Sequence, residues 1–154
     1  MKLKYILAVV LLSITFNQIN AQDSSNVHSG DNSYVLDQYY KLNLKVFQAG
    51  STPEDVDNIF ELFTDDFTYV HPQYGGVYTR EDLYNGYIRN QKNGGYDGSV
   101  VDIRVENKII GLNAIAVNKR FIKKEDGKIV EGEAQMALFE FKDGMISRIY
   151  EYWK

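Results

Sequence analysis

The sequence contains no cysteine and only two histidines. Without cysteine the chain has no disulfide framework and no thiolate chemistry, and no lipid can be attached through a cysteine. His28 lies in a polar N-terminal stretch, which leaves His71 as the only histidine expected inside a folded domain. We expect no metal, because a zinc site would lack nitrogen and sulfur ligands.

The motifs of common cofactor-binding and hydrolase folds are also missing from the sequence. No glycine-rich phosphate loop follows a predicted strand, and there is no nucleophilic serine elbow. Gly75-Gly76 falls in a predicted turn between strands, so it does not form a phosphate cradle. We therefore expect no cofactor.

The first residues have the pattern of a secretory signal peptide. Lys2 and Lys4 precede an apolar run over residues 5–16, and Ala21 supplies a small residue at the expected cleavage site. The run is shorter than the roughly 20 residues that span a bilayer. The expected organisation is a signal peptide over 1–21, a flexible segment over 22–32 and one domain over 33–154.

Acidic residues outnumber basic ones, 21 against 17, for a formal net charge of −4. Loss of Lys2 and Lys4 with the leader makes the net charge of the exported chain about −6. Such a surface repels phosphate backbones and anionic lipids, so we expect neither a nucleic acid nor a membrane as a partner. The leader predicts a periplasmic or secreted location.

Three helices are predicted in the first half of the domain. The first has candidate N-caps at Asp31, Asn32 and Ser33 and reaches about Ala49, ahead of Gly50. The next two helices start at Thr52 and Thr79, each with acidic residues in its first turn. The residues expected to face the core recur at helical spacing. They are Leu36, Tyr39, Tyr40, Asn43, Val46 and Phe47, then Val56, Ile59, Phe60 and Phe63, then Leu83, Tyr84, Tyr87 and Ile88.

The rest of the chain follows the two-residue period of β-strands. Apolar and charged residues alternate from Val101 to Ile109, which predicts a strand with one buried face. Further strands are predicted over 113–124, 128–142 and 145–153, with turns at Asp126-Gly127 and Asp143-Gly144. Helices followed by an antiparallel meander predict an α+β domain with the helices on one face of a curved sheet.

Four segments form a recognisable pattern: residues 62–66, His71-Pro72, residues 76–83 and residues 139–153. Together they resemble the nuclear transport factor 2-like superfamily, in its SnoaL-like and ketosteroid-isomerase-like branch. The resemblance implies a cone-shaped, curved antiparallel sheet wrapped around three N-terminal helices, with one apolar pocket. Members of this group include isomerases, polyketide cyclases, dehydratases, epoxide hydrolases and non-catalytic binders, and homodimers through the outer sheet face are common.

The resemblance assigns His71 to the position at which ketosteroid isomerases carry a general-base aspartate. A neutral imidazole there could accept a proton at neutral pH. The alternative is a half-buried histidine that ends a strand and bonds to a backbone carbonyl.

The resemblance also implies that Ile149, Glu151 and Trp153 face the pocket, while Tyr150 and Tyr152 face outward. An inward carboxylate must be paired or protonated, because an isolated buried charge is costly. Glu151 beside an apolar wall could act as an acid or a base. Alternatively, Glu151 pairs with an Arg or Lys on an exposed sheet face.

The oxyanion hole of the isomerases corresponds to positions near Asn43 and Ala137. Tyr39, Tyr40 or Asn43 could donate a hydrogen bond, but the side chain of Ala137 cannot. This difference argues against a steroid-type isomerase.

Other charged residues are interpreted as solvated surface. Asp102 and Arg104 share one strand face, which is typical of a cross-strand charged surface. Residues 119, 120, 123 and 124 are all basic and are interpreted as a solvated hairpin, with Arg120 a candidate for the pocket rim.

Three functions remain open. The favoured one is a binding domain that holds a small hydrophobic or aromatic molecule, because Tyr39, Tyr87 and Trp153 would suit a flat apolar ligand. The second is a cofactor-independent isomerase, dehydratase or cyclase in which His71 and Glu151 transfer a proton. The third is a non-catalytic dimeric interaction module. The expected ligand-binding residues are Tyr39, Tyr40, Asn43, Tyr87, Ala137, Ile149 and Trp153.

Overall fold

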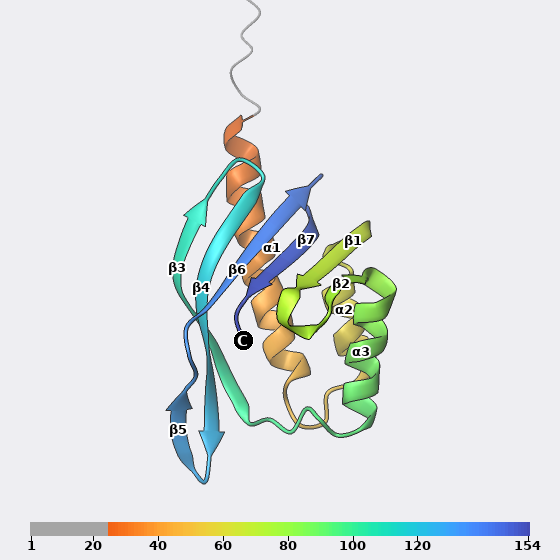
Figure 1. Ribbon diagram of the computed structural model, residues 1–154, viewed down its shortest axis with the longest axis vertical. Helices are drawn as coiled ribbons and strands as arrows, with labels where there is room; N and C mark the ends of the chain where they lie inside the picture. The colour runs from red at the N-terminus through yellow and green to blue at the C-terminus, as the bar shows by residue number, and fades with distance from the viewer. Residues whose placement is uncertain (1–24) are drawn as a thin grey trace, which may run out of the picture.

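The computed structural model describes residues 25–154, with side chains from Asn32 onward. Its elements are shown in Figure 1. They are α1 (Ser25–Val46), α2 (Pro53–Phe60), β1 (Phe63–His71), the 3-10 turn η1 (Pro72–Tyr74), β2 (Gly76–Thr79), α3 (Arg80–Lys92), β3 (Val100–Ile110), β4 (Ala114–Glu125), β5 (Lys128–Glu131), β6 (Gln135–Lys142) and β7 (Met145–Tyr152). The expected signal peptide lies outside the described residues. Within residues 25–154, no helix is both long enough and apolar enough to cross a membrane.

Reciprocal hydrogen bonds define the starts of α2 and α3, as the sequence predicts. The hydroxyl of Thr52 accepts from the amide of Asp55, and the Asp55 carboxylate accepts from the Thr52 amide at 2.8 Å. Thr79 and Asp82 form the same capping box at the start of α3. Each box satisfies amide groups that the first helical turn would otherwise leave unpaired.

Helix α1 begins earlier than its candidate caps indicate. It starts at Ser25, so Asp31, Asn32 and Ser33 lie within the helix, and residues 25–32 are helical rather than a separate flexible segment. The sheet contacts the helix from Ser33 onward, because Lys108 on β3 forms an ion pair with Asp37 and reaches the hydroxyl of Ser33.

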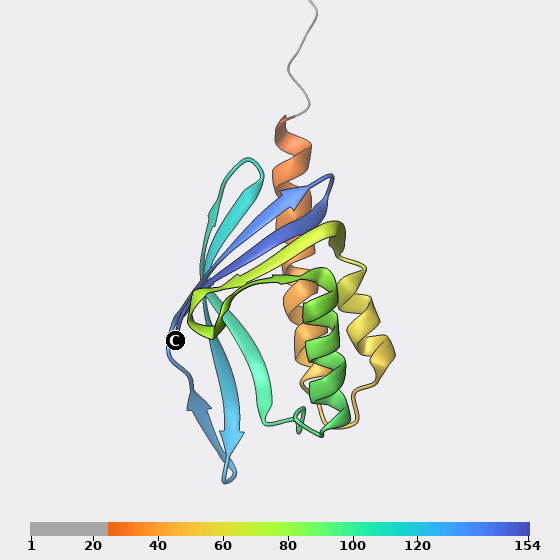
Figure 2. The ribbon, with the colours of Figure 1, turned by 45° about the vertical axis from the view of Figure 1, so that its right-hand side comes forward.

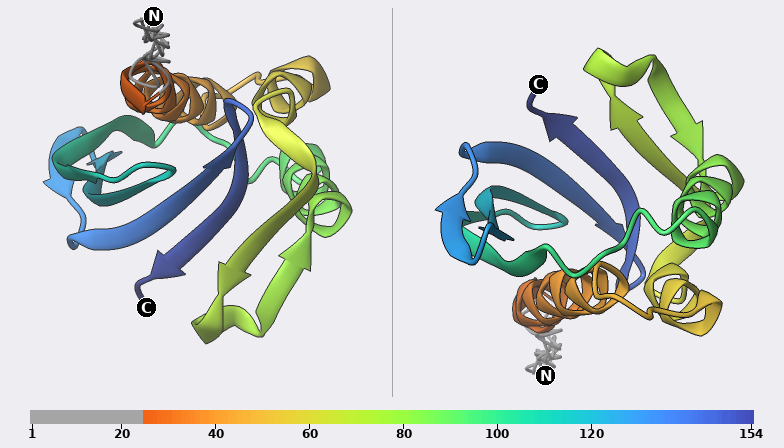
Figure 3. Two further views of the ribbon diagram at one scale, coloured as in Figure 1. Left: turned by 90° about the horizontal axis from the view of Figure 1, so that it is seen from above. Right: turned by 90° about the horizontal axis from the view of Figure 1, so that it is seen from below.

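The strands form one sheet in the order β2-β1-β7-β6-β4-β3, with β5 paired to β4. The expected antiparallel arrangement holds for every pair except β1 and β7, which run parallel. These two strands are distant in sequence and no hairpin turn joins them, so nothing local requires them to be antiparallel. The curved sheet wraps around the helices (Figures 2 and 3), and α1 packs against β3, β4 and β7 while α3 packs against β1 and β2.

The strand predicted over residues 128–142 is interrupted between β5 and β6. The amide of Gly132 donates to the carbonyl of Phe121 at 2.9 Å. A Cβ atom at this position would lie 3.0 Å from that oxygen, so the close approach depends on glycine. The predicted hairpin turns are confirmed, because Asp126 and Asp143 have positive φ angles and each precedes a glycine that also does.

Alternation along the central strands decides which side chains face the helices. The inward residues Ile115, Val117 and Lys119 on β4, Ala137 and Phe139 on β6, and Ile149 and Glu151 on β7 are all buried. Outward residues are more open: Met136 is 48% exposed and Tyr152 is 52% exposed. The predicted register of the last strand is confirmed, since one residue of slip would reverse this pattern.

Candidate functional site

Two neighbouring chambers lie between the helices and the concave face of the sheet. The inner chamber has a volume of about 250 Å³ and the outer one about 420 Å³. Tyr69, Leu83, Tyr87 and Trp153 line both chambers and therefore lie at the boundary between them. Leu83 and Tyr87 lie on α3, whose inward face is only half-buried.

A buried ion pair forms the polar end of the inner chamber. The ammonium of Lys119 lies 2.9 Å from each carboxylate oxygen of Glu151. The indole Nε1 of Trp153 donates to one of these oxygens at 2.6 Å. The side chains of Lys119 and Glu151 are only 3% and 5% exposed, so both charges depend on each other rather than on water.

The sheet brings these two charges together across an intervening strand. Lys119 lies on β4 and Glu151 on β7, and both strands pair with β6. Because neighbouring strands are about 4.8 Å apart, the two side chains must span roughly 10 Å by leaning toward each other over β6. Ala137 is the residue of β6 paired with Glu151, and its single methyl group leaves room for the bridge.

Tyrosine side chains also line the inner chamber. The hydroxyl of Tyr87 donates to Asn43 Oδ1 at 2.6 Å, and Asn43 Nδ2 donates to the carbonyl of Tyr39 at 3.0 Å. The hydroxyl of Tyr40 is buried without any hydrogen-bond partner. Burial, and next the negative charge of Glu151, raise the pKa of both Tyr39 and Tyr40 well above its usual value. These phenols therefore stay protonated and remain hydrogen-bond donors.

His71 lines the outer chamber rather than the inner one. It is 1% exposed, and neither ring nitrogen has a hydrogen-bond partner, so the alternative of a half-buried histidine bonded to a carbonyl is wrong. Its ring lies 4.3 Å from the ring of Tyr74 and 4.5 Å from that of Trp153, measured between centroids. Trp153 thus contacts both His71 and Glu151.

Most of the expected ligand-binding residues line the inner chamber: Tyr39, Tyr40, Asn43, Tyr87 and Trp153, together with Glu151. Ala137 and Ile149 line neither chamber, because both are fully buried within the packed sheet face. Their small or apolar side chains support the site without reaching the cavity.

Lys119 was expected on a solvated hairpin, and that interpretation is wrong. Its position continues the inward series of Ile115 and Val117, a signal that was visible in the alternation of the sequence. Arg120 points the other way and pairs with Glu106 at 2.7 Å. Arg104 pairs with Glu131 in the same exposed manner, as expected for a charged surface.

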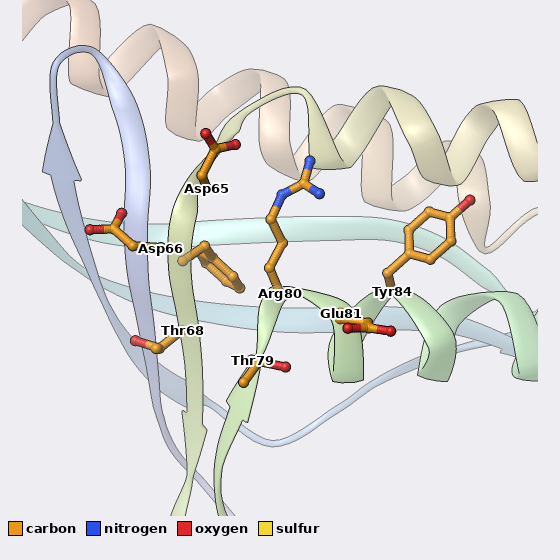
Figure 4. Close-up of a pocket in the computed structure, with 8 residues that line it drawn as sticks. Asp65, Asp66, Thr68, Thr79, Arg80, Glu81 and Tyr84 are labelled. Carbon is orange, nitrogen blue, oxygen red and sulfur yellow. The ribbon is translucent and has the colours of Figure 1, made fainter.

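A larger hollow of about 570 Å³ lies outside the cone, where side chains of β1 and of the start of α3 face each other (Figure 4). Two of its charged groups, Arg80 and Asp66, have structural partners. Arg80 Nη2 donates to the carbonyl of Phe60 at 2.9 Å, and Asp66 pairs with Lys142 at 3.3 Å. We therefore assign the candidate site to the chambers.

Among the described residues, no group of three or more potential metal-binding side chains occurs.

The buried ion pair between Lys119 and Glu151 leads to a prediction for the stability of the fold. Lys119→Met leaves the Glu151 carboxylate buried without its counter-charge and should lower the free energy of unfolding by about 3–5 kcal/mol. The double variant Lys119→Met/Glu151→Leu should recover most of this loss, since it removes both charges. Urea denaturation measures both effects. Lys142→Met, which breaks an exposed pair, is the matched control. An equal effect of Lys119→Met and Lys142→Met would show that water screens the inner pair.

No protein-family model matches the sequence, and comparison with curated proteins gave no match. Solved structures of similar shape do exist. An LEH-like epoxide hydrolase of M. tuberculosis is 15% identical, with a TM-score of 0.58 over 82% of this chain and 84% of that one. SalBIII, an epoxide hydrolase/cyclase-like enzyme with a role in pyran ring formation in salinomycin, is 17% identical, with a TM-score of 0.58 over 81% of this chain and 92% of that one.

An NTF-2 like protein of unknown function from Burkholderia xenovorans is 15% identical, with a TM-score of 0.56 over 82% of this chain and 84% of that one. Similarity at this level of identity concerns the fold and carries no activity with it. This chain has the α+β cone fold of the nuclear transport factor 2-like superfamily, as its sequence motifs predict.

Proposed function

We propose that the protein binds a small, flat, apolar molecule with one polar group in the inner chamber. The observation that carries this proposal is an aromatic cavity of about 250 Å³ that has a buried ion pair among its lining residues and a second chamber beside it. Apolar walls with a few placed polar groups are typical of small-molecule sites. The outer chamber would serve as the entrance.

The distribution of polar groups supports a ligand of this chemistry. The aromatic rings of Tyr40, Phe121 and Tyr87 offer flat surfaces for a ring system. The hydroxyl of Tyr40 is a buried donor without a partner, so a ligand oxygen would satisfy it. The volume accommodates a molecule of one or two rings rather than a large polycyclic one.

Cofactor-independent proton transfer, as in an isomerase, dehydratase or cyclase, is the alternative. His71 and Glu151 are the residues proposed to carry it. They line different chambers, and the Glu151 carboxylate already accepts hydrogen bonds from Lys119 and Trp153. A substrate would have to reach both groups past Trp153, which is why we favour binding.

Binding can be followed through the only tryptophan of the chain, Trp153, because it lines both chambers. Titration with cinnamyl alcohol, which has one ring and one hydroxyl, should change its fluorescence in a saturable manner. Ile103→Phe places extra volume in the inner chamber and should weaken binding by about tenfold or more, equivalent to about 1.4 kcal/mol. Met136→Phe, on the outer sheet face, is the control and should bind as the native protein does. A fluorescence response that Ile103→Phe leaves unchanged would argue against the inner chamber.

Export from the cytoplasm belongs to the same proposal and rests on the pattern of residues 1–21. Cell fractionation followed by N-terminal sequencing should find a chain that starts at Gln22 in the periplasm or the medium. An uncleaved chain confined to the cytoplasm would contradict it.

We also propose that two copies associate through the outer face of β6 and β7. Met136 pairs across the strands with Tyr152, and Leu138 with Tyr150, which makes one apolar patch. The rings of Tyr150 and Tyr152 stack with centroids 5.0 Å apart. Such a patch can pair with its own copy around a two-fold axis.

Tyr152→Lys would place two like charges at this interface and should shift the protein from dimer to monomer in sedimentation velocity experiments. Val77→Lys, on the exposed β2 strand, is the matched control and should leave the association unchanged. A native protein that stays monomeric at the highest concentration tested would rule out the dimer.

A further inference from the structure

Lys119 is chemically unlike the other lysines of the domain. It is 3% exposed, whereas every other lysine among the described residues is at least partly open to solvent. It also lines the inner chamber, so its ammonium group faces the space where a ligand would bind. Lysines that act as nucleophiles in proteins lie in buried positions of this kind.

The surroundings of Lys119 supply what a reaction at the amine requires. Both oxygens of Glu151 lie 2.9 Å from the lysine nitrogen and are placed to accept its proton. The nitrogen also lies 5.9 Å from the ring centroids of Tyr40 and Phe121, which form apolar walls around it. Glu151 is therefore the group placed to take up a proton when the lysine nitrogen reacts.

A second observation points to a ligand oxygen beside this nitrogen. The hydroxyl of Tyr40 is buried, lacks a hydrogen-bond partner and belongs to a residue that lines the same chamber. Because burial keeps this phenol protonated, it can donate a hydrogen bond to an oxygen atom of the ligand. Nucleophile, proton acceptor and oxygen-binding donor are therefore gathered around one small cavity.

We propose that Lys119 forms a reversible imine with the carbonyl group of an aromatic or flat apolar aldehyde or ketone held in the inner chamber. This proposal rests on the proposed ligand-binding function and names the chemical class of the ligand. Non-covalent binding in the cavity would not need a covalent bond, so imine formation goes beyond the proposed binding function.

The reaction balances without any further reactant. Glu151 takes one proton from the ammonium, and the amine attacks the carbonyl carbon, forming the C–N bond while Tyr40 donates a hydrogen bond to the oxygen. One proton of the attacking nitrogen passes to this oxygen, Glu151 returns the proton that it took, and the carbinolamine loses the oxygen as water. The product is a protonated imine that keeps the positive charge opposite Glu151, so the ion pair is preserved from reactant to product.

The test uses cinnamaldehyde and sodium cyanoborohydride, which reduces an imine to a stable amine. Intact-mass analysis of the purified protein at limiting aldehyde should show one adduct, and peptide mapping should place it on Lys119. Lys119→Arg keeps the charge opposite Glu151 but removes the nucleophile, and it should slow labelling by at least about tenfold, equivalent to about 1.4 kcal/mol. Lys142→Arg, which alters an exposed paired lysine, should label at the native rate.

Adducts spread over the exposed lysines, with Lys119 unlabelled in the native protein, would overturn the imine. Because this mapping is done on the native chain, it decides the question even if Lys119→Arg does not fold. Saturable binding of cinnamyl alcohol, which cannot form an imine, separates the two proposals. Binding of the alcohol without labelling of Lys119 refutes the imine alone, whereas failure of both refutes the binding function as well.

Discussion

The ion pair between Lys119 and Glu151 is the constraint on which the interior of the cone depends. Each charge is buried, and neither would be tolerated there without the other. The pair requires inward positions on β4 and β7, and it requires a residue as small as Ala137 on the strand between them. It also requires a third donor, which Trp153 supplies from the end of the last strand.

Trp153 links this constraint to the shape of the cavity. Its indole donates to Glu151, packs against the buried ring of His71, and lines both chambers. The position of the indole is therefore determined by the ion pair on one side and by His71 on the other. A side chain held in this way lies at the boundary between the inner chamber and the outer one.

The same fold supports binding proteins and enzymes, so the chemistry of the inner chamber must decide the function. A paired carboxylate is a weak candidate for a general base acting alone, and His71 faces another chamber. A buried lysine beside a carboxylate and an unpaired phenol is a distinct arrangement, suited to recognising a carbonyl compound. The proposals for binding and for imine formation both follow from these neighbours rather than from the fold.

Local sequence signals were sufficient for the elements whose causes are local. The capping boxes at Thr52 and Thr79 and the Asp-Gly turns follow from hydrogen bonds and backbone preferences within a few residues, whereas the inward position of Glu151 was predicted from the family resemblance. Periodicity also marked Lys119 as inward, but its charge favoured a solvated position. Only the tertiary structure shows that Lys119 is buried, because its partner Glu151 is 32 residues away in sequence.

Non-local pairing decided the rest. The parallel contact of β1 with β7 and the ion pair of Lys108 with Asp37 on α1 join segments that lie far apart in the chain. The two chambers likewise exist only once α3 packs loosely over the sheet. The sequence by itself therefore determined the α+β cone and the apolar residues that face its interior. Only the tertiary structure decided which buried charges meet there, since the energy of an ion pair depends on distance and burial.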